Sequence, residues 1–301
     1  MKILVTGANG QLGWELSRCL RPLGQVIALD RRAADLAQPD TLSALVADTE
    51  PDVIVNAAAY TAVDKAEAEE DLATRINGRA VAVLSEAARR RGALFFHYST
   101  DYVFAGDKVG AYLEEDATSP LNAYGRSKRA GEEALLEAGG DWLALRTTWV
   151  YAARGGNFLR TMLRLARERE TLRVVADQIG APTSARWLAE TSAFVIDRAL
   201  GERRRGAFQS GIYHCSAAGQ ASWFEFAEAI IARARERLGP GAIKTVRIEP
   251  IASSAYPVPA RRPHNSLLDM TRFEERFALH RTDWRTSLDL VLDELLPGAA
   301  G

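Results

Sequence analysis

The sequence has few cysteines, no long apolar run and no excess of charge of either sign. Its two cysteines, Cys19 and Cys215, are too few for the disulfide framework of a small secreted domain, and no metal-ligand spacing surrounds them. No apolar stretch approaches the roughly 18 to 20 residues that a membrane-spanning helix needs. The 38 basic and 39 acidic residues give a formal net charge of -1, and the basic residues are scattered. Because nucleic-acid binding needs a dense positive face, we expect a cytoplasmic protein with reduced thiols that binds neither membranes nor nucleic acids.

The two ends of the chain carry little information about function. The first residues already have a strand pattern, so we expect no signal peptide. The Ala- and Gly-rich tail after Pro297 is expected to fray. A length of 301 residues suits one large α/β domain or two joined domains.

Short β-branched runs alternate with helical stretches through the first half of the chain. Strands that are apolar throughout and separated by helices predict a parallel sheet covered on both faces. The predicted strands are 2–6, 25–30, 52–58, 93–100 and 142–151, and the predicted helices are 11–20, 41–49, 71–91 and 122–138.

The alternation is less regular after Tyr151. There we predict helices over 158–169, 184–200 and 222–238, a strand over 211–217, a turn over 180–183 and a Pro-rich ordered loop over 250–263. No internal repeat or low-complexity segment interrupts this pattern.

Three glycines follow the first predicted strand as Gly7-x-x-Gly10-x-x-Gly13, directly before a predicted helix. The first permits a tight turn, the second lets the backbone approach phosphates, and the third lets the helix pack close to the strand. The positive N-terminal end of the helix then faces the anion. The spacing is a variant of the usual dinucleotide fingerprint, and a plain glycine-rich turn is the alternative. Its position at the first strand favours a dinucleotide site.

Asp30 ends the second predicted strand, seventeen residues after Gly13. An acid there can accept a hydrogen bond from an adenosine ribose hydroxyl, which favours NAD. Arg31 and Arg32 follow at once, and guanidinium groups suit the 2′-phosphate of NADP. Both cofactors therefore stay open at this point. Asp35, with Leu36, either contacts the adenine or is a solvated loop acid.

Tyr124 and Lys128 lie four residues apart, on one face of a predicted helix. A free tyrosine has a pKa of about 10, and a nearby ammonium favours the phenolate, so we expect Lys128 to lower the pKa of Tyr124 toward the working range. Thr100 ends the fourth predicted strand, on the side where ligands bind in open parallel sheets. This pair of residues also occurs by chance on many helices, but together with the glycine loop it predicts a nicotinamide-dependent reductase.

These motifs, with Asn56-Ala57-Ala58-Ala59-Tyr60-Thr61 and Ser99-Thr100-Asp101-Tyr102-Val103-Phe104, resemble the extended short-chain dehydrogenase/reductases. Within that group the chain is similar nearly end to end to the dTDP-4-dehydrorhamnose reductase family. The more specific matches are Gly13-Trp14-Glu15-Leu16, Ala62-Val63-Asp64-Lys65-Ala66-Glu67, Arg146-Thr147-Thr148-Trp149-Val150-Tyr151, Asn157-Phe158, Asp177-Gln178-x-Gly180-Ala181-Pro182-Thr183 and Ala260-Arg261-Arg262-Pro263-x-Asn265-Ser266.

The resemblance implies a Rossmann-type doubly wound parallel sheet in an α/β fold with a smaller C-terminal substrate-binding α/β domain. We expect the cofactor domain over 1–150, joined by the helix 184–200, and the sugar-nucleotide domain mainly over 151–301.

The resemblance also implies that NADPH or NADH reduces C4 of dTDP-4-dehydro-L-rhamnose to give dTDP-L-rhamnose. Tyr124 would protonate the C4 oxygen, Lys128 would also hold the nicotinamide ribose, and Thr100 would orient the carbonyl. The expected cofactor-binding residues are Gly7, Gly10, Gln11, Leu12, Gly13, Asp30, Arg31, Asp35, Leu36, Ala59, Tyr60, Thr61, Tyr98, Tyr124 and Lys128, and the expected substrate-binding residues are Thr100, Asp101, Trp149, Arg261 and Arg262. Trp149 can equally be a core residue, the two arginines can equally be surface charge, and we interpret His97 as a buried strand residue.

Some relatives bind Mg²⁺ through acidic side chains at a dimer contact. Glu15 and Glu190 are the candidates here, and a homodimer is the corresponding prediction. Two acids without a third ligand are weak support for a hard-cation site.

Two other functions compete with the reductase. A sugar-nucleotide epimerase or dehydratase of the same superfamily is the first, although Asp101 is followed by Tyr102 and lacks the second acid that dehydration needs. The second is a non-catalytic binding partner, like the regulatory β subunit of methionine adenosyltransferase, because a fold alone does not prove turnover. The presence of Thr100, Tyr124 and Lys128 argues against such a partner.

Overall fold

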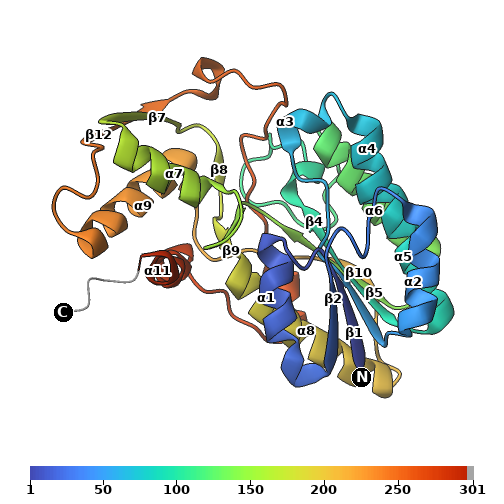
Figure 1. Cartoon of the computed structure of the whole chain (residues 1–301). Coiled ribbons are helices and arrows are strands. Elements are labelled where there is room, and N and C mark those ends of the chain that lie inside the picture. Colours follow the sequence, from blue (N-terminus) through green and yellow to red (C-terminus); the bar gives the residue numbers. More distant parts are fainter. Residues whose placement is uncertain (297–301) are drawn as a thin grey trace.

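The computed structural model describes residues 1–296, and the predicted fraying after Pro297 lies outside the described residues. Two units lie side by side (Figure 1), a larger one around a parallel sheet and a smaller one around α7, α9 and α11. None of the helices within residues 1–296 combines the length and apolar character required to cross a membrane.

A six-stranded sheet forms the centre of the larger unit, in the order β10-β5-β4-β3-β1-β2. Every neighbouring pair is parallel, because each strand is followed by a helix that returns the chain to the same edge. The order reverses between β1 and β3, and such a switch point opens a crevice at the carboxyl ends of the strands. The strands are β1 (Lys2–Thr6), β2 (Gln25–Leu29), β3 (Val53–Asn56), β4 (Leu94–Thr100), β5 (Trp142–Thr147) and β10 (Gly211–His214).

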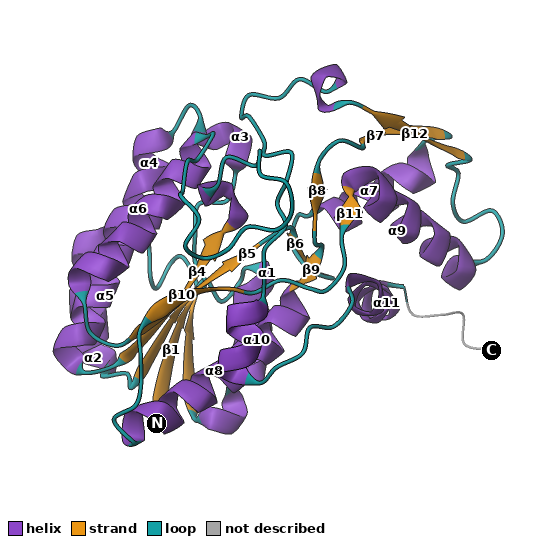
Figure 2. Ribbon diagram, turned by 180° about the vertical axis from the view of Figure 1, so that it is seen from behind, coloured by secondary structure: helices purple, strands orange, loops and turns teal. Residues whose placement is uncertain are grey.

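Helices cover both faces of this sheet (Figure 2). One face packs against α1, α8 and α10, whose side chains share a core with Val5 and Val55. The other face packs against α2, α5 and α6, around Leu4 and Ile54. The alternation of faces along each strand explains why these strands are apolar throughout. This doubly wound α/β architecture confirms the predicted fold class. The helices of the larger unit are α1 (Gln11–Cys19), α2 (Leu42–Thr49), α3 (Val63–Ala66), α4 (Glu70–Thr74), α5 (Ala80–Arg91), α6 (Ala123–Ala138), α8 (Ala185–Arg204) and α10 (Thr271–Phe277), with short 3₁₀ turns at Arg21–Leu23, Pro39–Thr41 and Asp101–Val103.

The long helix predicted over 71–91 is interrupted. One turn of π-helix, Arg75–Arg79, separates α4 from α5. Such turns bend a helix and often occur at functional sites. Here the turn carries Asn77, which is buried and directed at the loop after β3.

The smaller unit has its own apolar core, formed by α7, α9 and α11 against the parallel pair β7–β12. The strands β7 and β12 and the helices α10 and α11 were not predicted, and 250–251 belongs to a strand rather than to the predicted loop. The elements are α7 (Phe158–Glu168), β7 (Thr171–Val175), α9 (Trp223–Leu238), β12 (Arg247–Ile251) and α11 (Trp284–Leu295), with a 3₁₀ turn at Ser253–Ala255 and the two-residue strands β6 (Val150–Tyr151), β8 (Ile179–Gly180), β9 (Thr183–Ser184) and β11 (Ala221–Ser222).

The chain passes between the two cores several times. Side chains of α8, β10 and α10 join the core of the sheet, although all three follow residue 151. We therefore keep the division into two domains as a proposal and assign 211–214 and 271–277, with the predicted helix 184–200, to the cofactor-binding unit.

Candidate active site

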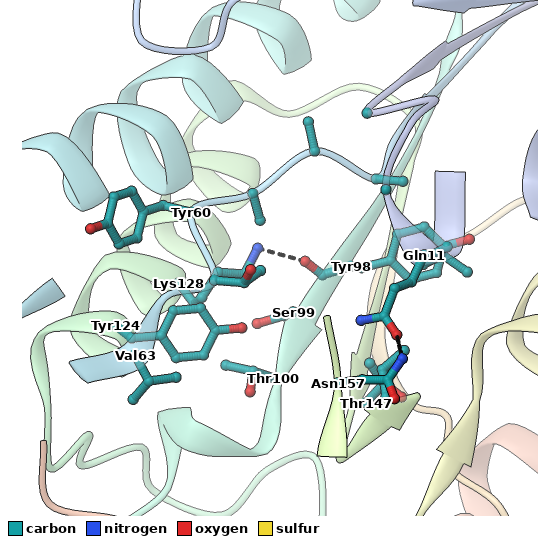
Figure 3. A pocket seen from close by; sticks show the side chains of 18 of the residues that line it. Gln11, Tyr60, Val63, Tyr98, Ser99, Thr100, Tyr124, Lys128, Thr147 and Asn157 are labelled. Carbon is teal, nitrogen blue, oxygen red and sulfur yellow. Dashed lines mark hydrogen bonds between the residues drawn. The ribbon is translucent and has the colours of Figure 1, made fainter. Parts of the chain in front are cut away.

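A cavity of about 640 Å³ lies at the carboxyl edge of the sheet, between the two units. Its walls come from the loops after β1, β2, β3, β4 and β5, from α6, and from the first residues of α7 and α9. Figure 3 shows part of this lining, with Thr100, Tyr124 and Lys128 opposite Gln11 and Asn157. A volume of this order suits an organic ligand. Of the residues predicted from the sequence, the cavity is lined by Gly7, Gly10, Gln11, Leu12, Arg31, Asp35, Leu36, Ala59, Tyr60, Thr61, Tyr98, Thr100, Asp101, Tyr124, Lys128 and Trp149.

Neighbouring backbone atoms lie so close to Gly7 and Gly13, in and after the loop that follows β1, that a Cβ atom has no room there. Gly7 has φ 74°, and a Cβ atom there would lie 2.9 Å from the backbone of Ala58. At Gly13 a Cβ atom would lie 2.0 Å from the carbonyl oxygen of Gly7. Gly13 therefore packs the helix onto the loop and does not line the cavity.

The glycine loop fits the diphosphate of a dinucleotide. α1 begins at Gln11, and its N-cap residue Gly10 offers no side-chain acceptor to the first amides. Free amides at the positive end of a helix bind anions. The residues present are therefore suited to NAD(P).

Asp30 lies beside this cavity, in an adjoining pocket that it shares with Arg31 and Arg32. One carboxylate oxygen accepts from the backbone amides of Arg32 and Ala33, and the other lies 3.2 Å from the amide nitrogen of Asn9. The Arg31 side chain is largely exposed and lies 3.5 Å from Asp35. The carboxylate and the guanidinium groups that favour different cofactors are therefore neighbours in space.

Arg261 and Arg262 are not brought to the cavity. The guanidinium of Arg262 makes two hydrogen bonds to the carboxylate of Asp64, at 2.8 and 2.9 Å. The carbonyl of Arg261 accepts from the side chain of Asn122, and its own side chain is exposed. Arg262 is thus engaged by an acid that the sequence analysis did not pair with it, and the diphosphate clamp remains a prediction.

α6 carries Tyr124 and Lys128 on the face that lines the cavity. Its N-cap residue Asn122 accepts from the amide of Gly125 at 2.8 Å, which starts the helix directly before Tyr124. Lys128 Nζ donates to the carbonyl of Tyr98 at 2.7 Å (Figure 3) and lies 3.2 Å from His97 Nε2.

Burial controls the acidity of these two groups. It raises the pKa of Tyr124 to about 12, opposed by the nearby hydroxyl of Thr100. It also lowers the pKa of Lys128 to about 8, opposed by the charge of Glu132. The expected lowering of the Tyr124 pKa toward the working range is therefore wrong, because desolvation of the buried phenolate is the dominant effect. Tyr124 is protonated at neutral pH, which is the state that a proton donor needs.

The sequence analysis missed Asn77. From the π-helical turn its side chain makes hydrogen bonds to both the amide and the carbonyl of Tyr60, at 2.8 and 3.0 Å, and to Ser127 at 2.9 Å. Ser127 lies between the two catalytic candidates on α6. Asn77 therefore fixes the loop after β3 relative to α6.

A second missed contact joins the glycine loop to the smaller unit. The side chain of Asn157, the N-cap of α7, donates to Gln11 at 2.8 Å (Figure 3). Gly155 also packs against the Gln11 side chain. The N-terminus of α1 is therefore held from both units.

Trp149 forms the far wall of the cavity with an unusual backbone. Its φ is 48°, a left-handed conformation that splits the predicted strand 142–151 into β5 and β6. Its indole stacks on Trp223 of α9, with ring centroids 3.5 Å apart and 7° between the planes. Gly180 packs against the same indole, where a Cβ atom would approach to 2.5 Å. Trp223 also lines the cavity and was not predicted.

Comparison with known proteins identifies the family. The model of the RmlD substrate binding domain matches residues 1–296. The dTDP-4-dehydrorhamnose reductase of Burkholderia thailandensis is 57% identical over 296 residues, covering 98% of this chain and 99% of the relative. The Escherichia coli K12 enzyme of the same name is 45% identical over 304 residues, covering 100% of both chains. The chain belongs to the dTDP-4-dehydrorhamnose reductase family.

Solved structures agree with this family. The dTDP-4-dehydrorhamnose reductase of Bacillus anthracis, solved in complex with NADP, superposes with a TM-score of 0.88 at 35% identity and covers 97% of this chain and 99% of its own. The UDP-glucose 4-epimerase of Thermus thermophilus in complex with NAD has a TM-score of 0.78 at 19% identity, with full coverage of both chains (100%). The latter likeness concerns the fold alone. The predicted family and the class of nicotinamide-dependent oxidoreductase are confirmed.

The magnesium site predicted for this member of the dTDP-4-dehydrorhamnose reductase family has no support. Within residues 1–296 there is no group of three or more His, Cys, Asp or Glu side chains that can hold a metal ion. Glu190 forms an ion pair with Arg186 at 3.1 Å. Glu15 is buried, and burial together with the charge of Glu294 raises the pKa of its carboxyl group. No third ligand completes the pair within residues 1–296.

Proposed function

We propose that this chain reduces the C4 ketone of dTDP-4-dehydro-L-rhamnose to give dTDP-L-rhamnose. The observation that carries the proposal is the joint placement of Tyr124, Lys128 and Thr100 in the cavity that also contains the glycine loop. The matching names of the B. thailandensis and E. coli relatives support the same substrate.

The residues of the chain act on the carbonyl oxygen of the substrate. A bound NAD(P)H supplies the hydride for C4. The hydroxyl of Thr100 donates to Asp101 Oδ1 at 3.1 Å in this structure and would turn to donate to the C4 oxygen of a bound substrate. The phenol of Tyr124 donates to the same oxygen and transfers its proton as negative charge develops there. With a pKa of about 12, Tyr124 holds that proton throughout the neutral range.

The same cavity offers groups that hold the sugar. Asp101 lies next to Thr100, and its Oδ2 atom is buried without a hydrogen-bond partner among residues 1–296. A sugar hydroxyl satisfies such an acceptor. Trp149, stacked on Trp223, supplies an apolar wall at that end of the cavity.

We further propose that the enzyme uses both NADPH and NADH. Asp30 supports an unmodified ribose and Arg31 supports a 2′-phosphate, and the two residues share the adjoining pocket. The free thiols Cys19 and Cys215 support a reducing, cytoplasmic location for this activity.

The test is to incubate the purified chain with dTDP-4-dehydro-L-rhamnose, once with NADPH and once with NADH, while absorbance and product are followed. The proposal predicts loss of one reduced cofactor for each ketosugar consumed, with dTDP-L-rhamnose as product. Turnover of the sugar without net loss of reduced cofactor would instead identify an epimerase, and cofactor binding without turnover would identify a non-catalytic partner.

A further inference from the structure

A row of buried polar side chains crosses the sheet beneath the glycine loop and ends at Lys128. Thr6, Asn56 and His97 are direct neighbours in the registers of β1, β3 and β4. The hydroxyl of Thr6 lies 2.6 Å from Asn56 Oδ1, and Asn56 Nδ2 lies 3.2 Å from His97 Nδ1. His97 Nε2 lies 3.2 Å from Lys128 Nζ. The three strand residues are at most 1% exposed, so this row has no access to bulk water.

Each hydrogen bond in this row needs one donor and one acceptor, which limits where the protons of the row can be. Burial and the charge of Lys128 lower the pKa of His97 well below its usual range, so the ring is neutral and carries one proton. One ring nitrogen therefore donates and the other accepts. A Lys128 ammonium has no lone pair and needs an acceptor at Nε2. Nδ1 then carries the proton and needs an acceptor from Asn56.

The structure places the oxygen of the Asn56 amide toward the Thr6 hydroxyl and its nitrogen toward His97. Half a turn of the amide exchanges the two atoms at nearly the same positions, so Asn56 can meet either requirement. With the oxygen toward His97, Nδ1 donates, Nε2 accepts and Lys128 is an ammonium. With the nitrogen toward His97, Nδ1 accepts, Nε2 donates and its partner is a neutral amine. The direction of the hydrogen bonds along the row is therefore linked to the charge of Lys128.

We propose that His97 is a positioning residue that acts through Lys128. Its unprotonated Nε2 holds the Lys128 ammonium in the catalytic cavity, and Asn56 selects the required tautomer by turning its amide oxygen toward His97. Nε2 and the carbonyl of Tyr98 accept from two of the three ammonium hydrogens. The third is left for the cofactor ribose. This inference rests on the proposed function, since it assigns a role within the same site.

Glu132 acts electrostatically on Lys128, and two further titratable groups line the same cavity. Tyr124 lies one turn before Lys128 on α6, and Asp101 lines the cavity from the end of β4. Glu132 lies one turn after it, and this carboxylate also binds Arg146 of β5 at 2.7 Å and Ser99 of β4 at 2.5 Å. Unlike these three groups, His97 lies within hydrogen-bond distance of Nζ as a neutral acceptor, so its removal has its own signature in the titration of Lys128.

The first test reads the tautomer directly and needs no turnover. Two-bond ¹H–¹⁵N correlation spectra are recorded on the ¹⁵N-labelled full chain, with and without NADPH, between pH 6 and pH 9.5. The chain has four histidines, so the spectrum of His97→Gln assigns the ring. At pH 6 the proton is expected on Nδ1, and it should move to Nε2 as Lys128 loses its charge. In Lys128→Met the proton is expected on Nε2 throughout.

The second test compares two substitutions of His97. His97→Leu removes the acceptor, and a lost hydrogen bond to the charged form lowers a lysine pKa. On the alkaline side of the pH profile, both kcat/KM and the affinity for NADPH fall as Lys128 loses its charge. The midpoint of this alkaline limb should move about one pH unit lower for both quantities. In His97→Gln the side-chain oxygen can accept from Nζ, and the limb should return toward that of the unchanged protein. His214→Leu is the matched control, a buried histidine of the same sheet whose Nδ1 lies 3.0 Å from the carbonyl of Asp269.

A proton on Nε2 at pH 6 would overturn the inference, whether or not the chain reduces the ketosugar. An unchanged alkaline limb in folded His97→Leu, or an equal shift in His214→Leu, would also overturn it. If His97→Leu does not fold, the spectra of the unchanged protein and of Lys128→Met decide alone. Failure of the proposed function leaves the tautomer result intact, so the two failures are distinguishable.

Discussion

Asp101 is a buried carboxyl group with one oxygen left without a partner among the described residues. Burial raises its pKa to about 7, opposed by the nearby hydroxyls of Ser266, Thr100 and Thr148. Near neutral pH it is therefore poised between a donor and an acceptor. A group of this kind suits a site that binds a hydroxylated ligand, which supplies the missing hydrogen bonds.

The raised pKa of Asp101 has a consequence for stability. The folded chain binds its proton more tightly than the unfolded chain, whose aspartate has a pKa near 3.8. The contribution to stability is therefore complete below about pH 4 and is lost as the pH rises through about 7. Between pH 4 and pH 7 the free energy of unfolding of the unchanged protein should therefore fall by roughly a few kcal/mol. In urea unfolding, Asp101→Asn should remove this fall. Equal pH dependence of the free energy of unfolding in both proteins would contradict the assignment.

At the scale of secondary structure, local patterns predict the strands and the site residues that follow them. The glycine loop, Thr100 and the Tyr124–Lys128 pair each lie within one short segment of sequence, so their spacing is visible there. The interruption at Arg75–Arg79 is not, because a π-helical turn has no periodic signature of its own. The break at Trp149 depends on a positive φ, which a tryptophan adopts only when tertiary packing enforces it.

The cap of α6 gives a prediction at this scale. Asn122→Ala removes the acceptor for the amide of Gly125 and should cost about 1 kcal/mol of stability. Because Tyr124 lies in the first turn, kcat should also fall several-fold. Asp283→Ala is the control, since Asp283 caps α11 by accepting from the amide of Arg285 at 2.8 Å, outside the cavity. A similar loss of stability with unchanged kcat is expected there. Equal effects on kcat in both variants would contradict the role given to the cap.

At the scale of the whole molecule, contacts between distant residues hold the cavity together. Asn77 binds Tyr60 and Ser127, and Asn157 binds Gln11 across 146 positions of sequence. No spacing rule reveals such pairs, and the same limit explains why β7 and β12 were not predicted. Each is a short strand whose partner lies far away in the sequence.

The ion pair of Asp64 and Arg262 joins the segment 252–266 to α3 of the larger unit. Arg262→Ala should increase amide hydrogen exchange in 252–266, because the bidentate contact is lost. Arg261→Ala is the control, since its side chain is exposed and its carbonyl contact with Asn122 does not depend on the side chain. A rise in exchange of equal size in Arg261→Ala would contradict this role. An increased KM for the sugar nucleotide in Arg261→Ala alone would support the predicted diphosphate contact for that residue.

In the proposed reaction the fold brings the phenol of Tyr124 to the C4 oxygen and a bound reduced nicotinamide to C4 itself. Tyr124→Phe tests this most directly, because it removes one hydroxyl and keeps the ring that packs edge-on against Tyr102. The dissociation constant for NADPH should stay within about twofold, while kcat for dTDP-4-dehydro-L-rhamnose falls by about 10²- to 10⁴-fold, as is typical of a proton-transfer group. A kcat close to that of the unchanged protein would contradict the account.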